Sequence, residues 1–104
     1  MFVHKIQEHL KIDETILDTI KSGMLYVTKQ GTAKEIFSDF PVDVAGKTGS
    51  AQVSGTTNAL FIGFAPFTNP EIAFCAVVEG GGSGNAAASL MKEILTYYFN
   101  IEKE

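Results

Sequence analysis

The chain has 104 residues, of which 45% are hydrophobic, and its formal net charge is -4 at pH 7. This length fits one small domain with a thin core, because small domains bury a smaller share of their surface than large ones. The acidic balance and the scattered basic residues argue against nucleic-acid binding, which requires clustered Lys and Arg to neutralise phosphates.

The amino terminus shows no export or anchoring pattern. Residues 1–5 lack the apolar stretch and cleavage site of a signal peptide, and no apolar run approaches the roughly 20 residues that span a bilayer. His4 and His9 precede the first predicted helix without a Cys or carboxylate cluster to complete a ligand set. We therefore interpret both histidines as solvated and predict no metal and no cofactor.

The first predicted helix begins at Asp13, which is expected to be its N-cap, and extends to about Lys29, with Gly31 as its C-cap. One apolar stripe recurs at spacings of three and four: Ile16, Ile20, Met24 and Val27. Gly23 lies inside this pattern at a cost of about 1 kcal/mol relative to Ala, which indicates close packing against another element.

A further helical turn is expected over residues 32–37, and from Val42 onward the pattern changes to strands separated by Gly, Asn and Pro clusters. Strands are predicted over residues 44–53, 59–65 and 72–79. Their connections of about five residues are too short for parallel crossovers, so the strands should form an antiparallel meander.

The last predicted helix runs from about Asn85 to Phe99 behind a glycine-rich joint, with Ser83 as its N-cap. One stripe of this helix should face the sheet: Ala88, Met91, Leu95 and Tyr98. The predicted fold class is therefore α+β, a three-stranded antiparallel meander packed with N-terminal and C-terminal helices.

Several apolar side chains of the predicted strands are expected to build the core. Cys75 lies in an uninterrupted apolar run and is interpreted as a small buried hydrophobe rather than a reactive thiol. The aromatic residues assigned to the sheet core are Phe61, Phe64, Phe67 and Phe74. Phe61 has an alternative place at the rim of a ligand groove, because strand alternation puts it on the face opposite Ile62.

The most informative segment is residues 45–52, which read Ala-Gly-Lys-Thr-Gly-Ser-Ala-Gln. Lys-Thr-Gly is a signature of penicillin-binding proteins and serine β-lactamases. Here it opens a predicted strand and is followed by two more strands, a glycine turn and a helix. Over residues 12–99 this order resembles the end of the transpeptidase domain of class B penicillin-binding proteins, most like the cell-elongation type. The resemblance implies part of a β-lactamase/transpeptidase-like fold.

An edge strand offers free N–H and C=O groups to an extended peptide, and acyl transfer needs donors for a substrate carboxylate and an oxyanion. The resemblance implies that the Lys47 ammonium stabilises the catalytic hydroxyl network. It also implies that the Thr48 and Ser50 hydroxyls hold a carboxylate and that the Ser50 backbone N–H is an oxyanion donor. Gly49 leaves the backbone accessible, and Gln52 completes the substrate-binding set. The alternative is a solvated lysine at Lys47 and a β-bulge at Gly49.

The nucleophile that this family requires is missing from its expected place. Neither Ser-x-x-Lys nor Ser-x-Asn occurs in residues 1–46, upstream of Lys-Thr-Gly. Both patterns occur downstream, at Ser89–Lys92 and Ser83–Asn85, in the wrong order. We interpret Ser83 as a helix cap and Ser89 and Lys92 as helix surface, so the chain alone is expected not to catalyse.

The resemblance implies that residues 1–104 are the carboxy-terminal portion of a peptidoglycan D,D-transpeptidase domain. The implied partners are a peptidoglycan stem peptide or a β-lactam and the missing upstream half, in a parent protein at the periplasmic face of the inner membrane. In the family, the third strand pairs with a strand from the start of the domain. Residues 72–79 should then expose an edge that joins two chains into a homodimer. Two alternatives are a stand-alone peptide-binding module and a serine β-lactamase relative acting through Ser89.

Overall fold

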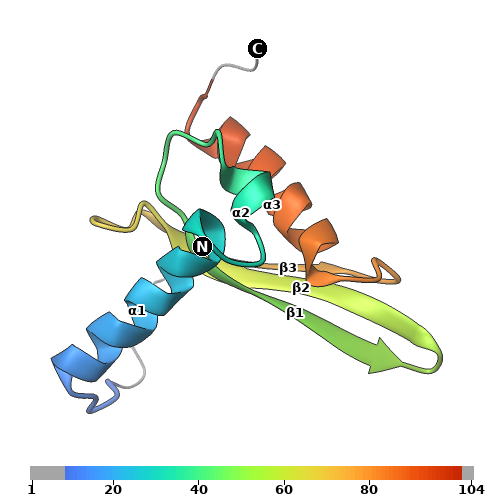
Figure 1. Ribbon diagram of the computed structural model, residues 1–104, viewed down its shortest axis with the longest axis horizontal. Helices are drawn as coiled ribbons and strands as arrows, with labels where there is room; N and C mark the ends of the chain where they lie inside the picture. Colours follow the sequence, from blue (N-terminus) through green and yellow to red (C-terminus); the bar gives the residue numbers. More distant parts are fainter. Residues whose placement is uncertain (1–8, 102–104) are drawn as a thin grey trace, which may run out of the picture.

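The computed structural model describes residues 9–101, which form helices packed against one sheet (Figure 1). In chain order the elements are α1 (Glu14–Lys29), α2 (Lys34–Phe37), β1 (Ala45–Val53), β2 (Thr56–Ala65), β3 (Ile72–Val78) and α3 (Gly84–Tyr98). The predicted α+β class is confirmed, and the observed elements lie close to the predicted ranges.

The sheet has the strand order β1-β2-β3, and both neighbouring pairs are antiparallel, as predicted. The connection between β1 and β2 is shorter than predicted, because the hairpin closes through Ser54 and Gly55 alone. These residues have positive φ angles of 47° and 85°. A turn with two left-handed residues matches the twist of antiparallel strands, so residues 56–58 are free to join β2.

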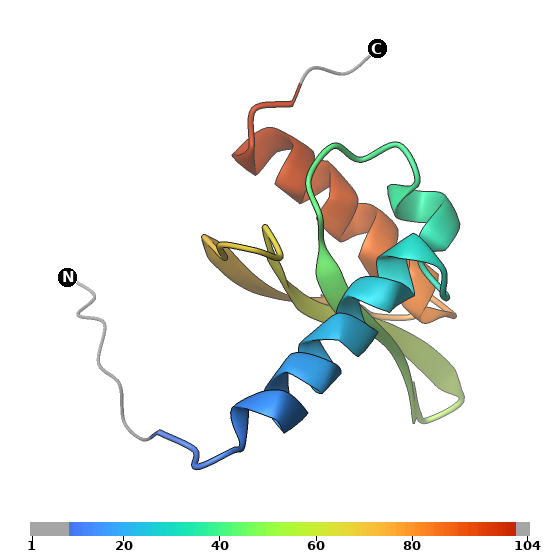
Figure 2. The ribbon, with the colours of Figure 1, turned by 60° about the vertical axis from the view of Figure 1, so that its left-hand side comes forward.

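The helices α2 and α3 lie on one face of the sheet, which we call the α3 face (Figures 1 and 2). Phe61 lies at the centre of the core on this face and is fully buried, so its alternative place at a groove rim is wrong. Its ring centroid lies 5.4 Å from that of Phe74 and 5.8 Å from that of Phe37. Phe64 and Phe67 instead stack on each other, 6.2 Å apart and partly buried, outside this buried core cluster.

The stripe predicted for α3 is confirmed at three positions. Ala88, Met91 and Leu95 are buried, whereas Tyr98 is 46% exposed. Tyr98 and Phe99, three and four residues after Leu95, both lie next to this stripe. Phe99 is the one that packs against the core. The placement of Tyr98 on the stripe that faces the sheet is therefore wrong.

Asp13 is the N-cap of α1, as predicted, and its Oδ1 accepts a hydrogen bond from the Thr15 N–H at 2.8 Å. At the other end the C-cap is Gln30, one residue before the predicted Gly31. A Cβ atom at Gly23 would meet nothing within 4 Å, so the predicted close packing at this glycine was wrong. The physical reason is that α1 leaves the sheet, and Ile16 and Ile20 in its first half are exposed.

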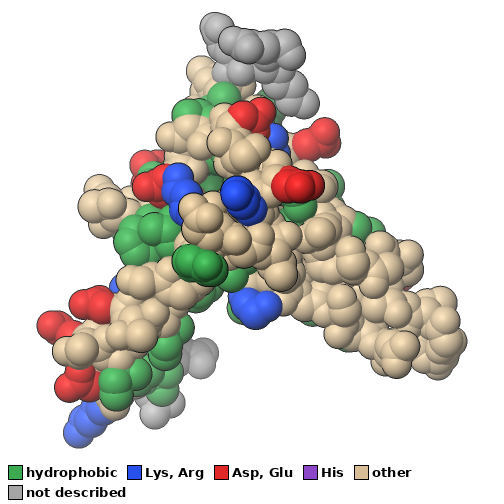
Figure 3. All heavy atoms as spheres, in the orientation of Figure 1, with side chains coloured by type: hydrophobic (Ala, Val, Ile, Leu, Met, Phe, Trp, Pro, Cys, Tyr) green, Lys and Arg blue, Asp and Glu red, His purple; other side chains and the backbone are tan. Residues whose placement is uncertain are grey.

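Hydrophobic side chains lie along one side of this projecting part of α1, and acidic side chains lie along the other (Figure 3). The α1 helix reaches the sheet at its C-terminal end, where the Thr28 hydroxyl donates to the Val44 carbonyl at 2.6 Å. This bond fixes the end of α1 against the residue that precedes β1.

The face of the sheet opposite α3, which we call the open face, carries apolar side chains that remain exposed. Ile62 is 47% exposed and Val77 is 52% exposed. Cys75 pairs with Ile62 across β2 and β3 and is exposed as well, so its predicted burial was wrong. Strand alternation places Cys75 on the open face, which no described helix covers to the extent that α3 covers the other.

Candidate functional site

β1 lies at one edge of the described sheet and carries the Lys-Thr-Gly segment in an unbroken ladder. Its residues pair in register with β2: Lys47 with Ile62, Thr48 with Phe61, Gly49 with Leu60, Ser50 with Ala59 and Gln52 with Thr57. Because the register runs through Gly49 without interruption, the alternative interpretation of this residue as a bulge was wrong.

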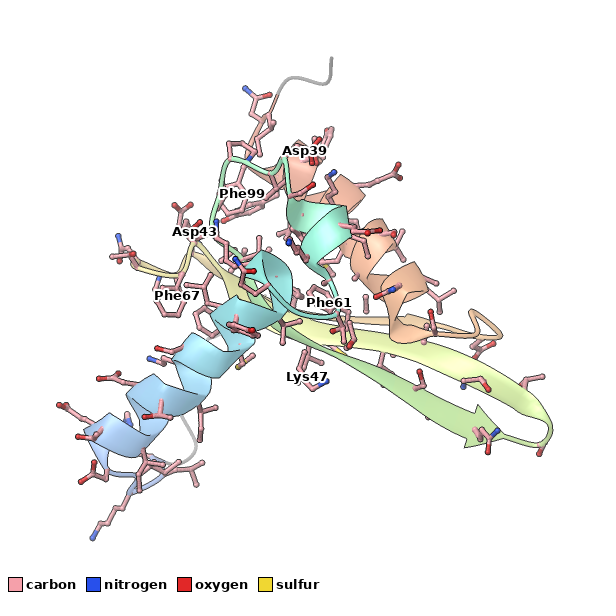
Figure 4. All side chains as sticks on the ribbon, viewed as in Figure 1. Asp39, Asp43, Lys47, Phe61, Phe67 and Phe99 are labelled. Carbon is pink, nitrogen blue, oxygen red and sulfur yellow. The ribbon has the colours of Figure 1, made fainter. Side chains whose placement is uncertain are left out.

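Lys47 projects from the open face, away from α3 (Figure 4), and its side chain is exposed. The Nζ atom donates a hydrogen bond to the Thr48 carbonyl at 3.0 Å. This contact bends the ammonium back over the strand, so the cation lies beside the backbone that an extended ligand would contact.

Thr48 is turned toward the opposite face, because it pairs with the buried Phe61. Its Oγ1 lies 3.1 Å from the Oγ1 of Thr32, in the connection between α1 and α2. No role for Thr32, which lies 16 positions earlier in the chain, is predicted from the sequence. A side-chain contact over that separation has no local signal, so the pattern of residues 31–33 alone was insufficient to find it.

The remaining predicted site residues follow along β1. Gly49 is partly buried, and a Cβ atom there would lie at an ordinary 3.6 Å from the Leu60 Cβ. Ser50 and Gln52 are exposed, with Gln52 next to the hairpin end of the strand. The structure therefore brings Lys47, Thr48 and Ser50 together on one short stretch and places Gln52 further along it.

The downstream Ser-x-x-Lys and Ser-x-Asn patterns have structural roles in α3. Ser83 is the N-cap, as predicted, although its side chain makes no cap hydrogen bond. Ser89 is exposed within the helix, and the Lys92 Nζ donates to the Asp39 Oδ1 at 2.8 Å. This hydrogen bond lowers the pKa of the Asp39 carboxyl below its ordinary value, and the charge of Lys92 adds to the effect. The Lys92 ammonium thus joins α3 to the loop after α2.

Within residues 9–101, no three His, Cys, Asp or Glu side chains are grouped as a metal ion requires. His9 is exposed, and His4 lies outside this range. None of the helices formed by these residues is both long enough and apolar enough to cross a membrane.

Comparison with known families defines the class of protein. The family model described as "Penicillin binding protein transpeptidase domain" matches residues 2–96, nearly the whole chain. The chain belongs to this family.

Two relatives that match the chain are peptidoglycan D,D-transpeptidases by name. The peptidoglycan D,D-transpeptidase MrdA of Escherichia coli K12 is 37% identical over 95 residues, which cover 74% of this chain and 15% of that protein. MrdA of Acinetobacter baumannii is 31% identical over 114 residues, covering 94% of this chain and 16% of that protein. The chain thus spans about a sixth of the length of these relatives.

Solved structures agree with the sequence comparison. Penicillin-binding protein PBP2 of Pseudomonas aeruginosa, in complex with WCK 5153, superposes with a TM-score of 0.80 at 36% identity and covers 88% of this chain and 21% of its own. PBP2 of Helicobacter pylori, in complex with MreC, gives a TM-score of 0.72 at 26% identity, covering 86% of this chain and 18% of its own. The predicted correspondence to the carboxy-terminal part of a class B transpeptidase domain is confirmed, together with the transpeptidase-like fold.

Proposed function

We propose that this chain supplies the Lys-Thr-Gly wall of the active site in a peptidoglycan D,D-transpeptidase domain. The observation that supports this proposal most strongly is the edge strand β1, which presents Lys47, Thr48 and Ser50 in a chain of this family. An extended peptide docks on such an edge as an additional strand, so backbone hydrogen bonds orient it before any chemistry begins.

Each site residue has a role that its position on β1 supports. The Lys47 ammonium stabilises the hydroxyl network around an upstream serine, and the hydroxyls of Thr48 and Ser50 hold the substrate carboxylate. The Ser50 backbone N–H donates to the developing oxyanion, where such donors act most strongly because the negative charge appears in the transition state. Gly49 leaves the backbone open to the ligand, and Gln52 contacts a more distant part of it.

The chain contributes binding and electrostatic stabilisation, while the covalent step belongs to the upstream half of the domain. Loss of a nucleophile removes acyl-enzyme formation, and the remaining binding groups recover only a small part of the rate. The pairing of Lys92 with Asp39 supports this division, because it engages the lysine of the downstream Ser-x-x-Lys pattern. A β-lactamase acting through Ser89 is therefore the weaker alternative.

We also propose the ligands of the site, the cellular location of the parent protein and the partners of this chain. The ligands are a peptidoglycan stem peptide ending in D-Ala-D-Ala, or a β-lactam that mimics it, and the parent protein works at the periplasmic face of the inner membrane. Residues 1–104 belong to one partial domain that is completed by its upstream half. Without that half, the exposed edge of β3 over residues 72–78 pairs with a second copy of the chain, because unpaired strand edges are templates for another strand.

Complementation tests the proposal. The chain is fused behind the upstream part of the transpeptidase domain of E. coli MrdA, and acylation by a fluorescent penicillin is measured as a second-order rate constant. Lys47→Ala is expected to lower this constant roughly 100-fold or more, the usual effect of removing one transition-state donor. Lys34→Ala, at an exposed lysine of α2, is the matched control and should acylate normally. Full acylation by the Lys47 variant would contradict the proposed role of β1.

A further inference from the structure

We propose that Thr32 is a positioning residue for Thr48. Its hydroxyl donates a hydrogen bond to the Thr48 Oγ1 and thereby directs the Thr48 proton toward the ligand carboxylate. This inference rests on the proposed function, in which Thr48 holds that carboxylate. It assigns a role to the connection between α1 and α2, which lies beside β1 and the N-terminal end of α3 (Figures 1 and 2).

The backbone around Thr32 is fixed on both sides. Four residues earlier, the buried Thr28 hydroxyl donates to the Val44 carbonyl at 2.6 Å, just before β1 begins. On the other side, Ala33 is fully buried and its N–H donates to the Val27 carbonyl at 3.0 Å. The connection is therefore held against β1, while the Thr32 side chain itself remains exposed to an arriving ligand.

The Thr48 side chain is confined on its second side by the start of α3. A Cβ atom on Gly84 would lie 2.7 Å from the Thr48 Cβ and 2.9 Å from the Gly49 backbone nitrogen. Such spacing leaves no room for a side chain at Gly84, so the helix end packs directly on the strand. Because threonine is β-branched and stiff at χ1, a Thr48 side chain held between Gly84 and Thr32 has few orientations left.

Hydrogen counting then fixes the direction of the bond between the two hydroxyls. Each hydroxyl has one proton to donate and two lone pairs that accept, whereas a carboxylate accepts only. If Thr48 donated to Thr32, it would have no proton for the carboxylate. An anion beside Thr48 therefore favours the chain in which Thr32 donates to Thr48 and Thr48 donates to the anion. Each proton stays on its own oxygen, and consecutive hydrogen bonds polarise one another, so the bond to the anion becomes stronger.

Lys47 does not compete for the same acceptor. Its Nζ donates to the backbone carbonyl of Thr48, so this contact uses neither lone pair of the Thr48 hydroxyl. The cation and the oriented hydroxyl thus act on a ligand independently. Removing the Thr32 hydroxyl should weaken recognition of the carboxylate and leave the Lys47 contribution unchanged.

The experiment uses the chain fused behind the upstream part of the P. aeruginosa PBP2 transpeptidase domain, with Thr32→Val as the test and Thr32→Ser as the conservative control. Acylation is measured with a penicillin and with its methyl ester, which lacks the anionic carboxylate. Thr32→Val should lower the rate constant for the acid about fivefold to tenfold, the scale of one hydrogen bond, with an unchanged rate constant for the ester. Thr32→Ser should restore the ratio of acid to ester.

Equal losses with acid and ester would show a purely structural role for Thr32 and overturn the inference. An unchanged acid rate constant in Thr32→Val, when Lys47→Ala abolishes acylation, would also overturn it and leave the proposed function intact. Normal acylation by Lys47→Ala would contradict both the proposed function and the inference about Thr32. In the chain by itself, three-bond couplings of Thr48 provide a second test. They should report one χ1 rotamer in wild type and Thr32→Ser and an average in Thr32→Val; a single rotamer in all three would count against the inference.

Discussion

The two faces of the sheet differ more than any other two regions of the molecule. On the α3 face, Phe61 and Leu95 are fully buried and aromatic rings stack on both sides of Phe61. On the open face, Ile62 and Val77 are about half exposed, and Lys47 projects into solvent (Figure 4). Neighbouring residues of the same strand, Phe61 and Ile62, thus experience opposite environments.

This difference indicates that the two faces of the sheet have different roles. A sheet inside a larger domain is normally covered on both faces, and an exposed apolar patch commonly marks an interaction surface. The α3 face supplies the stability of the chain itself. The open face carries the proposed functional lysine, so the groups that work with Lys47 are expected to come from whatever covers that face.

Truncating two neighbouring residues that face opposite sides of the sheet should give the largest contrast in stability. Phe61→Ala removes a fully buried ring and is expected to lower the free energy of unfolding by about 3–5 kcal/mol. Ile62→Ala, one residue along on the open face, should cost less than about 1 kcal/mol, because the side chain is already half solvated. Urea denaturation of the two variants measures both values. Similar losses would mean that the open face is covered in solution.

The outer edge of β3, which no strand within residues 9–101 pairs with, should control self-association. We expect the wild-type chain to sediment as a dimer at micromolar concentration, and Val77→Lys to weaken that dimer roughly tenfold or more, because a charge on an edge strand opposes pairing. Ile20→Lys is the matched control, since both side chains are 52% exposed. A wild-type monomer with rapid amide exchange along residues 73–78 would contradict the predicted dimer.

Two glycines should respond in opposite directions to the same change. Gly23→Ala is expected to stabilise the chain by about 1 kcal/mol, because Ala is the better helix former and nothing lies within 4 Å of the new Cβ. Gly84→Ala should destabilise it, because the new Cβ would come within 3 Å of Thr48 and the Gly49 backbone. Thermal unfolding distinguishes the two. Destabilisation by Gly23→Ala would indicate that α1 packs against another surface in solution.

The smallest expected effect is the pH dependence of the bridge between Lys92 and Asp39. The hydrogen bond from Lys92 lowers the pKa of Asp39 below 3.8, so the pair stabilises the fold above that pH and loses its effect as pH falls through the folded pKa. Lys92→Met should therefore unfold at a slightly lower temperature than wild type at pH 6. The difference should vanish once the pH lies below the lowered pKa of Asp39. Lys34→Met is the control, and a difference that persists in acid would show that Lys92 acts through packing instead.

Local patterns in the sequence predicted much of the fold. The caps at Asp13 and Ser83 depend on neighbouring residues, and the antiparallel order follows from short connections. The Lys-Thr-Gly segment was recognisable because its characteristic residues are consecutive in the sequence. Each of these features is decided within a few positions of the chain.

The errors arose where the outcome depends on distant residues. The apolar run around Cys75 predicts a strand, but burial on the open face requires a covering element that the described residues do not provide there. Gly23 likewise has no packing partner in this part of the chain. The contact between Thr32 and Thr48 depends on how the end of α1 packs against β1. The hydrogen bond from Thr28 fixes this packing, and no local sequence motif predicts it.

In the proposed function, this chain provides one wall of a transpeptidase site and not its nucleophile. Mass spectrometry after incubation with penicillin tests it most directly, with the chain alone and with the upstream half of the domain supplied by fusion. We expect an unchanged mass for the chain alone, and in the fusion one penicilloyl adduct located on the upstream serine. A penicilloyl adduct on Ser83 or Ser89 of the chain alone would contradict it.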